Sequence, residues 1–285
     1  MSGSAARAPV SACIITFDEE RNLKAALDSV AFADEIIVVD SRSRDRTREI
    51  AAGFRGARGS APRVIERDWP GHVEQKNYAI DQASNDWVLC IDADERVTPE
   101  LRAEVEAALS SGSDAVGYTM PRRTRYLGRW IRWGGWYPDR KLRLFRRSRG
   151  RWGGINPHDH VQVEGPVTDL SGDLLHFSYR GIEDHIRTID SFTDIAAREK
   201  DLRGTGRPLL GMIFHPPLKF LRMYILKQGF REGRAGLIIA LLGALYVFLK
   251  YAKLWELRSG KWREEAPAPA PLWIGGEAPP RGESS

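Results

Sequence analysis

The stretch Trp-Val-Leu-Cys-Ile-Asp-Ala-Asp-Glu, residues 87–95, decides how the rest of the chain is interpreted. Five apolar, strand-favouring residues are followed at once by two carboxylates one residue apart, Asp92 and Asp94. A short apolar run between polar residues predicts a buried strand, and open α/β sheets bind ligands at the carboxyl ends of such strands. Two carboxylates there suit a hard divalent cation that also holds substrate phosphates. The alternative is a strand-to-helix turn in which Asp is only a capping residue.

The composition limits the class of protein. The chain has 285 residues, 42% of them hydrophobic, and nine tryptophans, so it can bury a substantial core and is not disordered throughout. A net charge of +5 favours phosphorylated ligands, an anionic membrane surface or nucleic acid, without choosing among them. Cys13 and Cys90 lie in apolar runs, which predicts buried, reduced thiols of a cytosolic protein. The first nine residues lack the apolar core of a secretory signal.

Strand and helix patterns alternate through the first hundred residues, which predicts a parallel sheet with helices on both faces. Acidic residues follow the predicted strands at Asp18, Asp40 and Asp92, and the carboxyl ends of parallel strands share one edge, so these acids should converge on one crevice. The sequence has no G-x-G-x-x-G or Walker A motif, which disfavours a dinucleotide or P-loop site. The expected strands cover residues 10–17, 35–40, 63–67 and 87–91, and the expected helices cover 23–30, 48–54 and 72–83.

Four ordered motifs resemble those of family-two glycosyltransferases. Residues 14–23, Ile-Ile-Thr-Phe-Asp-Glu-Glu-Arg-Asn-Leu, are similar to the opening motif of that family, and residues 38–47 match Val-Val-Asp-Ser-x-Ser-x-Asp-x-Thr. Gln-Lys-Asn at 75–77 and Ile-Asp-Ala-Asp-Glu at 91–95 complete the set. The likeness extends to about residue 260 and is strongest to lipopolysaccharide-core β-glucosyltransferases. The departures are small: Ile15 and Phe17 replace the usual Pro and Tyr, and Asp18 replaces Asn. Phe17 can still stack on a base but lacks the hydroxyl.

The resemblance implies a GT-A fold, a Rossmann-like mixed sheet flanked by helices. It also implies a nucleotide-sugar donor and a bound Mg²⁺ or Mn²⁺, which would offset negative charge on the leaving nucleoside diphosphate. Arg143, in the motif Arg-Leu-Phe-Arg-Arg, would lie beside the donor phosphates. The residues implied to bind the donor are Thr16, Phe17, Asp40, Lys76, Asp92 and Arg143, and those implied to bind the metal are Asp94, Asp92 and His176.

The catalytic base is assigned to Asp159, again by resemblance. Members of the family place His-Glu where this chain has His158 and Asp159. Direct displacement requires the acceptor hydroxyl to be deprotonated on the face opposite the leaving group, which a positioned carboxylate can do. Asp is one methylene shorter than Glu, and His158 is the competing candidate for the base. For His176, the alternative to a metal ligand is an ordinary core or surface histidine.

The domain organisation follows from the same patterns. We expect a catalytic domain at 10–180, with a nucleotide-sugar half (10–113) and an acceptor half (114–180), between disordered tails at 1–9 and 263–285. In the acceptor half, residues 126–136 interleave aromatic, Arg and Gly residues, which fits either sugar stacking or a packed loop.

Residues 181–262 are expected to be helical and to associate with a membrane. The most apolar part, 236–249, is shorter than the roughly 18 to 20 residues of a spanning helix, and cations with Tyr and Trp flank it. That pattern predicts an interfacial helix pair on anionic lipid. The alternative is a buried helical hairpin that packs on the catalytic domain.

These features together predict an inverting, metal-dependent glycosyltransferase, peripheral on the cytoplasmic face of the cell membrane. It would transfer a hexose, glucose from UDP-glucose, to a lipid-linked saccharide such as a lipopolysaccharide core. One alternative keeps the fold but uses a polyprenyl phosphate as acceptor, and then no base is needed. The other is a non-enzymatic basic module that binds nucleic acid or membranes; 38 acidic residues against 43 basic ones argue against it, and we expect no nucleic-acid partner.

Overall fold

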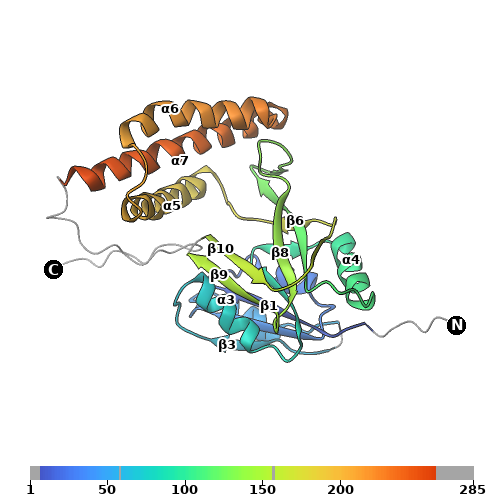
Figure 1. Ribbon diagram of the computed structural model, residues 1–285. Helices are drawn as coiled ribbons and strands as arrows, with labels where there is room; N and C mark the ends of the chain where they lie inside the picture. The colour runs from blue at the N-terminus through green and yellow to red at the C-terminus, as the bar shows by residue number, and fades with distance from the viewer. Residues whose placement is uncertain (1–6, 58, 156–157, 261–285) are drawn as a thin grey trace, which may run out of the picture. The chain divides into compact units, whose positions relative to one another are not determined.

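The computed structural model describes residues 7–57, 59–155 and 158–260. These residues form two compact units (Figure 1). The first comprises residues 7–122 and Asp139–His176, and the second comprises Arg123–Pro138 and residues 177–260. Of the expected tails at 1–9 and 263–285, residues 1–6 and 263–285 lie outside the described residues.

The amino-terminal half of the first unit is a parallel sheet, as the alternating pattern predicts. The strands lie in the order β3-β2-β1-β4 and all three pairings are parallel. A helix follows each of the first three strands and returns the chain to the same end of the sheet. The strands are β1 (Val10–Thr16), β2 (Glu35–Asp40), β3 (Arg63–Glu66) and β4 (Trp87–Asp92), and the helices are α1 (Leu23–Ser29), α2 (Thr47–Gly53) and α3 (His72–Asp81).

Beyond β4 the sheet becomes mixed, in agreement with the expected fold class. Strand β8 pairs antiparallel with both β4 and β6, and the order continues through β12 to β5, with β11 parallel to β6. A separate antiparallel hairpin is formed by β9 and β10. The bounds are β5 (Glu95–Val97), α4 (Pro99–Ser110), β6 (Gly117–Tyr126), β8 (Asp139–Arg146), β9 (Gly150–Ile155), β10 (His158–Val163), β11 (Val167–Asp169) and β12 (Leu174–His176).

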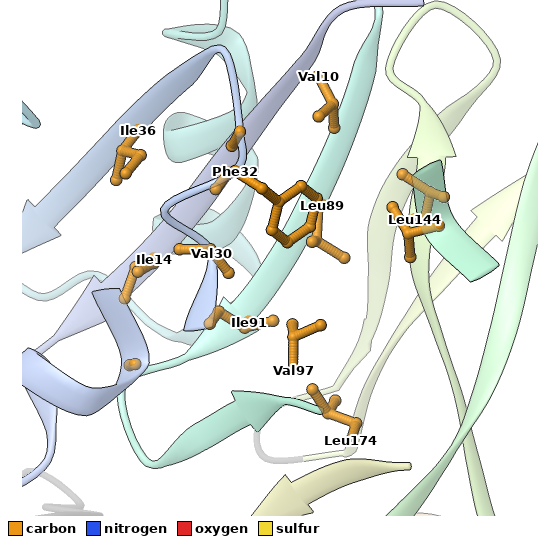
Figure 2. Close-up of a cluster of buried hydrophobic side chains, with 14 of the residues drawn as sticks. Val10, Ile14, Val30, Phe32, Ile36, Leu89, Ile91, Val97, Leu144 and Leu174 are labelled. Atoms are coloured by element: carbon orange, nitrogen blue, oxygen red, sulfur yellow. The ribbon is translucent and has the colours of Figure 1, made fainter. Parts of the chain in front are cut away.

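Strands β1, β2 and β4 are buried on both faces, which explains why they are almost entirely apolar before their last residue. Alternate residues of β1, such as Ile14, pack with α1 and α4 in one cluster (Figure 2). The intervening residues, such as Cys13 and Ile15, pack with α3 and the β9–β10 hairpin in another. Cys13 pairs with Cys90 across β1 and β4, and both thiols are buried and free, as expected. Each fully buried aliphatic side chain contributes about 1.5–3 kcal/mol, so this two-sided core holds the strand ends in place.

The second unit is helical, with one short strand. It contains β7 (Arg129–Trp130), which pairs with the end of β6, then α5 (Ile182–Leu202), α6 (Pro208–Leu221), η1 (Arg222–Leu226), η2 (Gly229–Glu232) and α7 (Gly233–Ser259). Helices α6 and α7 run side by side (Figure 1). Gly211 permits this approach, because a Cβ there would collide with the ring of Tyr251.

Residues 123–138, which we expected in the acceptor half of the catalytic domain, group by their contacts with this helical unit. The physical reason is Glu232, which is 3% exposed. Its carboxylate accepts hydrogen bonds from the backbone of Arg132 (2.7 Å) and Trp133 (3.0 Å) and pairs with Arg129 (3.2 Å). Tyr126 and other apolar residues of this segment are buried in the unit. The contacts therefore support the packed-loop interpretation of residues 126–136.

Helix α7 is longer than the apolar stretch that the sequence suggested. Helical structure runs through Gly229–Ser259, which is long and apolar enough to cross a membrane by length and composition. The expectation that this stretch is too short to span a membrane is therefore wrong, because the helix continues past both ends of the uninterrupted apolar run. Only 39% of the most apolar 18-residue stretch of this helix is buried, whereas the core helix of a soluble protein would be mostly buried.

The second unit should lose stability in mild acid because of His185. This residue is 6% exposed, its Nδ1 lies 2.9 Å from the Tyr126 hydroxyl, and burial lowers its pKa from 6.5 to about 4. Between those pH values the unfolded chain binds a proton that the folded chain excludes. The free energy of unfolding should therefore be intact above pH 6.5 and fall by about 3 kcal/mol as the pH drops to 4.

Urea unfolding at pH 7 and pH 4.5 measures this loss. The variant His185→Gln should depend less on pH over that range, since its side chain does not titrate. The control His215→Gln replaces an exposed histidine of the same unit and should keep the wild-type pH dependence. Equal pH dependence in His185→Gln and the wild type would contradict the prediction.

Candidate active site

The loops after β1 and β2 are joined by the polar residues of the second motif. The Ser43 hydroxyl donates to the Asp40 carboxylate, and the Ser43 backbone N–H donates to it as well (2.8 Å). The same hydroxyl accepts from the backbone N–H of Asp18 (2.9 Å), and the Thr47 hydroxyl accepts from that of Glu19 (2.8 Å). The spacing Asp-x-x-Ser-x-x-x-Thr thus fastens the second loop to the first.

Asp18 lies in the left-handed region, with φ of 48°. Asn and Asp tolerate this region better than other side-chain-bearing residues. Its carboxylate also accepts a hydrogen bond from the backbone of Arg44 (2.7 Å). Asp can therefore replace the Asn of similar sequences at this turn.

The predicted donor residues of these loops are mostly buried. Asp40 is fully buried; burial raises its pKa, and the Ser43 hydrogen bonds only partly offset that effect. Thr16 is 4% exposed and pairs with Asp40 across β1 and β2. Phe17, the next residue, is half-buried. In this arrangement the Asp40 carboxylate organises the loop of Ser43, while Phe17 retains accessible ring surface.

Asp92 ends β4 between two cations. Its carboxylate lies 3.0 Å from Lys76 Nζ and 2.9 Å from Arg143 Nη2. Burial would raise the pKa of Asp92, but the charges of Lys76 and Arg143 outweigh it and hold the pKa far below its usual value. Asp92 is therefore an anion at neutral pH, with 27% of its side chain exposed.

Lys76 also forms an ion pair with the predicted catalytic base, Asp159, beside Asp92. Its Nζ lies 2.8 Å from Asp159, which is on β10 and has a 10% exposed side chain. The structure thus gathers Lys76, Asp92, Arg143 and Asp159 from α3, β4, β8 and β10. The structure does not describe the side chain of His158, the competing candidate for the base.

Trp152 of β9 is a part of this cluster that the sequence reasoning missed. Its ring is 5% exposed and lies 4.4 Å from Lys76 Nζ and 5.3 Å from the Arg143 guanidinium carbon, both measured to the ring centroid. Cation–π contacts in a desolvated place are worth about 2 kcal/mol. A lone Trp in a Gly-rich strand carries no sequence signal for that role.

Arg143 occupies a β-bulge, which explains its inward direction. In the register of β6 and β8, Tyr118 pairs with Leu144 and Thr119 with Leu142, so Arg143 is the extra residue. It is 4% exposed and is bound within the protein to Asp92 and Glu95. Burial opposes its charge, but these carboxylates raise the pKa of Arg143 above its usual value. The structure thus places Arg143 beneath Asp92, with its guanidinium engaged by carboxylates.

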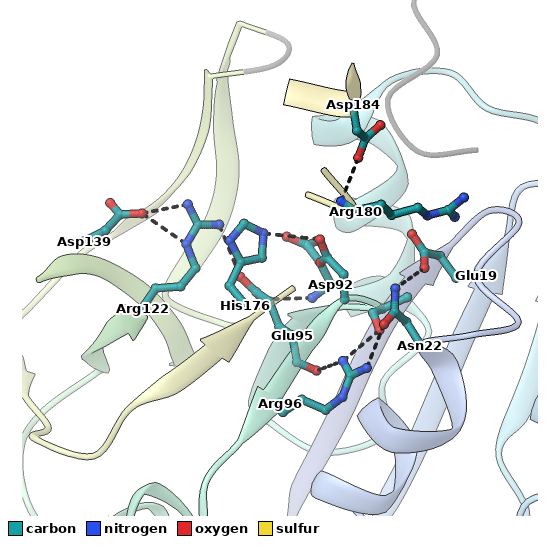
Figure 3. Close-up of polar contacts among 12 residues, drawn as sticks. Glu19, Asn22, Asp92, Glu95, Arg96, Arg122, Asp139, His176, Arg180 and Asp184 are labelled. Atoms are coloured by element: carbon teal, nitrogen blue, oxygen red, sulfur yellow. Dashed lines mark hydrogen bonds and ion pairs between the residues drawn. The ribbon is translucent and has the colours of Figure 1, made fainter. Parts of the chain in front are cut away.

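Glu95 anchors the site and was also missed. It is fully buried, accepts from the backbone N–H of Asp92 (3.0 Å), and pairs with Arg143 (2.7 Å) and Arg122 (3.3 Å). Arg122 in turn pairs with Asp139 (2.6 Å; Figure 3). The sequence signal was a third carboxylate directly after Asp94, but its spacing does not distinguish an anchor from a solvated side chain.

Asp94 pairs with His176, as part of the predicted metal set. His176 Nε2 lies 3.2 Å from the Asp94 carboxylate, because β12 pairs with β5 directly beside it. Burial would raise the pKa of Asp94, but His176 lowers it overall, while the nearby charge of Asp92 opposes that shift. No three His, Cys, Asp or Glu side chains form a ready metal cluster among the residues that the structure describes. The carboxylate of Asp92 is instead bound by Lys76 and Arg143.

The loop after β1 is linked to the residues around Asp92 and Glu95 by a short series of hydrogen-bonded polar side chains. Asn22 donates to Glu19 (2.7 Å) and accepts from Arg96 (2.9 Å), which follows Glu95 on β5 (Figure 3). The carboxyl edges of β1, β2 and β4 therefore form one connected polar surface. The acids that follow these strands lie along it, as the sequence predicts.

Comparisons with known proteins agree on the family. The model of "Glycosyl transferase family 2" matches residues 11–163. The chain is 33% identical over 262 residues to the lipopolysaccharide core biosynthesis glycosyltransferase LpsC of Rhizobium meliloti (strain 1021), covering 90% of this chain and 95% of that protein. It is 30% identical over 272 residues to an uncharacterized glycosyltransferase of Rickettsia prowazekii (strain Madrid E), covering 87% of each.

A solved structure supports the fold. The mannosyltransferase PcManGT from Pyrobaculum calidifontis, in complex with GDP-Man and Mn²⁺, matches with a TM-score of 0.51 and 15% identity, covering 93% of this chain and 92% of that chain. At that identity the likeness shows the fold alone, which is of the GT-A type. The interpretation as a non-enzymatic basic module is therefore wrong. The matched motifs and the relatives together show that the chain belongs to glycosyl transferase family 2 and is a glycosyltransferase.

Proposed function

We propose that this enzyme is inverting and metal-dependent, and that it transfers a hexose from a nucleotide sugar to a lipid-linked saccharide. The observation that carries the proposal is the cluster of Asp92, Lys76 and Asp159, which joins predicted donor residues to the predicted base. UDP-glucose is the proposed donor, from the resemblance of the motifs. A lipopolysaccharide core is the proposed acceptor, in line with the name of the relative LpsC, a lipopolysaccharide core biosynthesis glycosyltransferase.

We assign the divalent cation to the predicted set of Asp94, Asp92 and His176. Asp94 and Asp92 supply anionic oxygen ligands of the kind that Mg²⁺ and Mn²⁺ prefer, and His176 supplies an imidazole beside Asp94. The depressed pKa values keep both carboxylates deprotonated, as metal ligands must be. When bound, the cation would offset the negative charge that develops on the leaving nucleoside diphosphate. The relative PcManGT was solved with Mn²⁺, which is consistent with this choice.

The chain's own residues would divide the remaining work. Lys76 supplies a positive charge between the donor side, at Asp92, and the base, at Asp159. Asp159 would accept the proton of the acceptor hydroxyl as that oxygen attacks the sugar. Arg143 and Glu95 would hold Asp92 in position without touching the substrate, since both are buried.

Asp159→Asn tests the role of the base. For a hydroxyl acceptor we expect transfer to fall about a thousandfold, within the range of general-base effects, with donor binding retained. The measurement is the rate of sugar transfer, together with equilibrium binding of UDP-glucose. The exposed Asp114→Asn serves as the matched control and should remain fully active. Full activity in Asp159→Asn would instead favour a polyprenyl phosphate acceptor, which is already an anion.

The outer surface of α6 supports action at a membrane. Its large apolar side chains point to solvent, whereas the half-buried Lys219 faces α7 and the exposed His215 lies 3.0 Å from the Tyr251 hydroxyl of that helix. This reversal of the usual pattern fits a face in contact with lipid. Exposed cations follow at Arg222, Lys227 and Arg231, which fits an anionic, cytoplasmic membrane face. The exposed apolar residues are Leu209, Leu210, Ile213, Phe214, Leu218 and Leu221.

Equilibrium binding of nucleotide sugars to the purified enzyme tests the proposal as a whole. We expect one UDP-sugar to bind in the presence of Mn²⁺ and to bind much more weakly after chelation. A folded sample that binds no nucleotide sugar under either condition would overturn the assignment of the donor. Binding that is unaffected by chelation would overturn metal dependence alone.

A further inference from the structure

The second unit contains a cavity of about 230 Å³ that the transfer chemistry does not use. Its walls come from α5, η1 and α7 and from the segment that ends at Pro138, and most of them are apolar or aromatic. Trp136, Phe192, Met223 and Leu242 are examples. A cavity of this kind can accept part of a hydrocarbon chain.

A lysine faces this apolar space. Lys219 of α6 lines the cavity, and its stem lies near Gly243 of α7. The Lys219 side chain is half-buried; burial and then the charge of Arg222 lower its pKa. In soluble proteins a lysine turned inward usually pairs with a carboxylate.

Two further lysines lie close by. Lys250 lies 5.1 Å and Lys200 5.6 Å from the centroid of the Tyr251 ring. Burial lowers the pKa of Lys250, and the charges of Lys200 and Lys219 lower it further. Lys250 Nζ also lies 5.7 Å from the ring centroid of Tyr246, which lines the cavity, so the charges of Lys200 and Lys219 repel Lys250 beside the cavity wall.

The nearby carboxylates do not relieve this repulsion. On α5, Glu199 pairs with Arg203 (2.6 Å), Asp190 and Asp194 both pair with Lys253 (2.7 Å), and Asp201 pairs with Arg258 (3.2 Å). Among the residues that the structure describes, no carboxylate lies within ion-pair distance of the three lysines. The cluster thus has a surplus of positive charge next to an apolar cavity.

We propose that this place binds an anionic lipid, with its phosphate at Lys219, Lys250 and Lys200 and part of one chain in the cavity. Both parts of the ligand are specified by the site: the lysines select a negative charge, and the apolar walls select a hydrocarbon chain. The site lies wholly within the second unit, so the inference does not depend on the proposed donor, metal or base. It adds a bound lipid molecule to the lipid contact proposed for the outer face of α6.

The test compares lipids that differ only in charge. The full-length protein is freed of lipid in detergent, and binding of dioleoylphosphatidylglycerol is measured by native mass spectrometry and by the shift in Tm. We expect one molecule to bind and to raise Tm, while dioleoylphosphatidylcholine and inorganic phosphate at equal concentration bind at least tenfold more weakly. Equal binding of the neutral lipid would overturn the charged site, and equal stabilisation by inorganic phosphate would overturn the role of the chain.

Two variants test the lysines and the apolar cavity separately. In K219M/K250M, affinity for phosphatidylglycerol should fall at least tenfold, while Tm without lipid should be unchanged or higher because the repulsion is gone. Thr188→Phe places a ring in the cavity from α5 and should also weaken lipid binding. Lys24→Met, an exposed lysine on α1 of the first unit, is the matched control and should bind like the wild type. Wild-type affinity in either test variant would overturn the proposal.

Discussion

Asp94→Asn is expected to lower sugar transfer about a thousandfold. Asp94 pairs with His176 at the end of the site, and its low pKa keeps it an anion. A metal ion contributes several kcal/mol to the stabilisation of a leaving group's charge, and each 1.36 kcal/mol is a factor of about ten in rate. Losing about 4 kcal/mol of that stabilisation gives the expected effect. The assay is transfer from UDP-glucose at saturating Mn²⁺, with Mn²⁺ binding measured independently by electron paramagnetic resonance.

The binding measurement separates a metal ligand from a structural residue. Asp94→Asn should bind Mn²⁺ much more weakly in the presence of UDP while unfolding at the wild-type temperature. The control Asp114→Asn removes a carboxylate that is exposed and outside the site, and both activity and Mn²⁺ binding should be unchanged. Wild-type Mn²⁺ affinity in Asp94→Asn would contradict the assignment of this residue as a ligand.

Glu95→Gln is expected to destabilise the first unit by about 3–5 kcal/mol. The carboxylate is fully buried between Arg143 and Arg122, and removing one partner from a buried charge network leaves the others uncompensated. Arg143, at 4% exposure, cannot recover this loss from water. Urea unfolding followed by tryptophan fluorescence measures the change.

Two comparisons show whether charge is the cause. Glu100→Gln, at an exposed position of α4, should change stability by no more than about 0.5 kcal/mol. The double variant Glu95→Gln/Arg143→Met removes both charges and should be more stable than Glu95→Gln alone. A double variant that is less stable than the single one would argue that the two residues act independently.

Much of the first unit could be predicted from the sequence, because its signals are local. The strands predicted at 10–17, 35–40 and 87–91 are mostly apolar, and each ends within one residue of the observed β1, β2 or β4. The spacing around Ser43 and Thr47 reflects hydrogen bonds between two neighbouring loops, so it survives as a readable motif. Strand ends at one edge of a parallel sheet must lie close together, which brings their acids together whatever the details of packing.

The direction of individual side chains could not be predicted in the same way. Arg143 belongs to an alternating basic and apolar strand, and nothing in that pattern shows the bulge that turns it beneath Asp92. Glu95 and Trp152 acquire their roles from partners that are distant in the sequence, such as Arg122 and Lys76. Segment 123–138 joins the helical unit because of Glu232, about a hundred residues away.

The sequence by itself determined the strands, the family motifs and the apolar character of the last helices, because each depends on residues close together in the chain. Only the tertiary structure decided which charges are buried and paired. It turned Lys219 inward and the leucines of α6 outward, an orientation that composition does not contain. The physical reason is that burial and ion pairing depend on contacts between distant segments, and one residue of displacement along a strand or helix changes the partners of a charge.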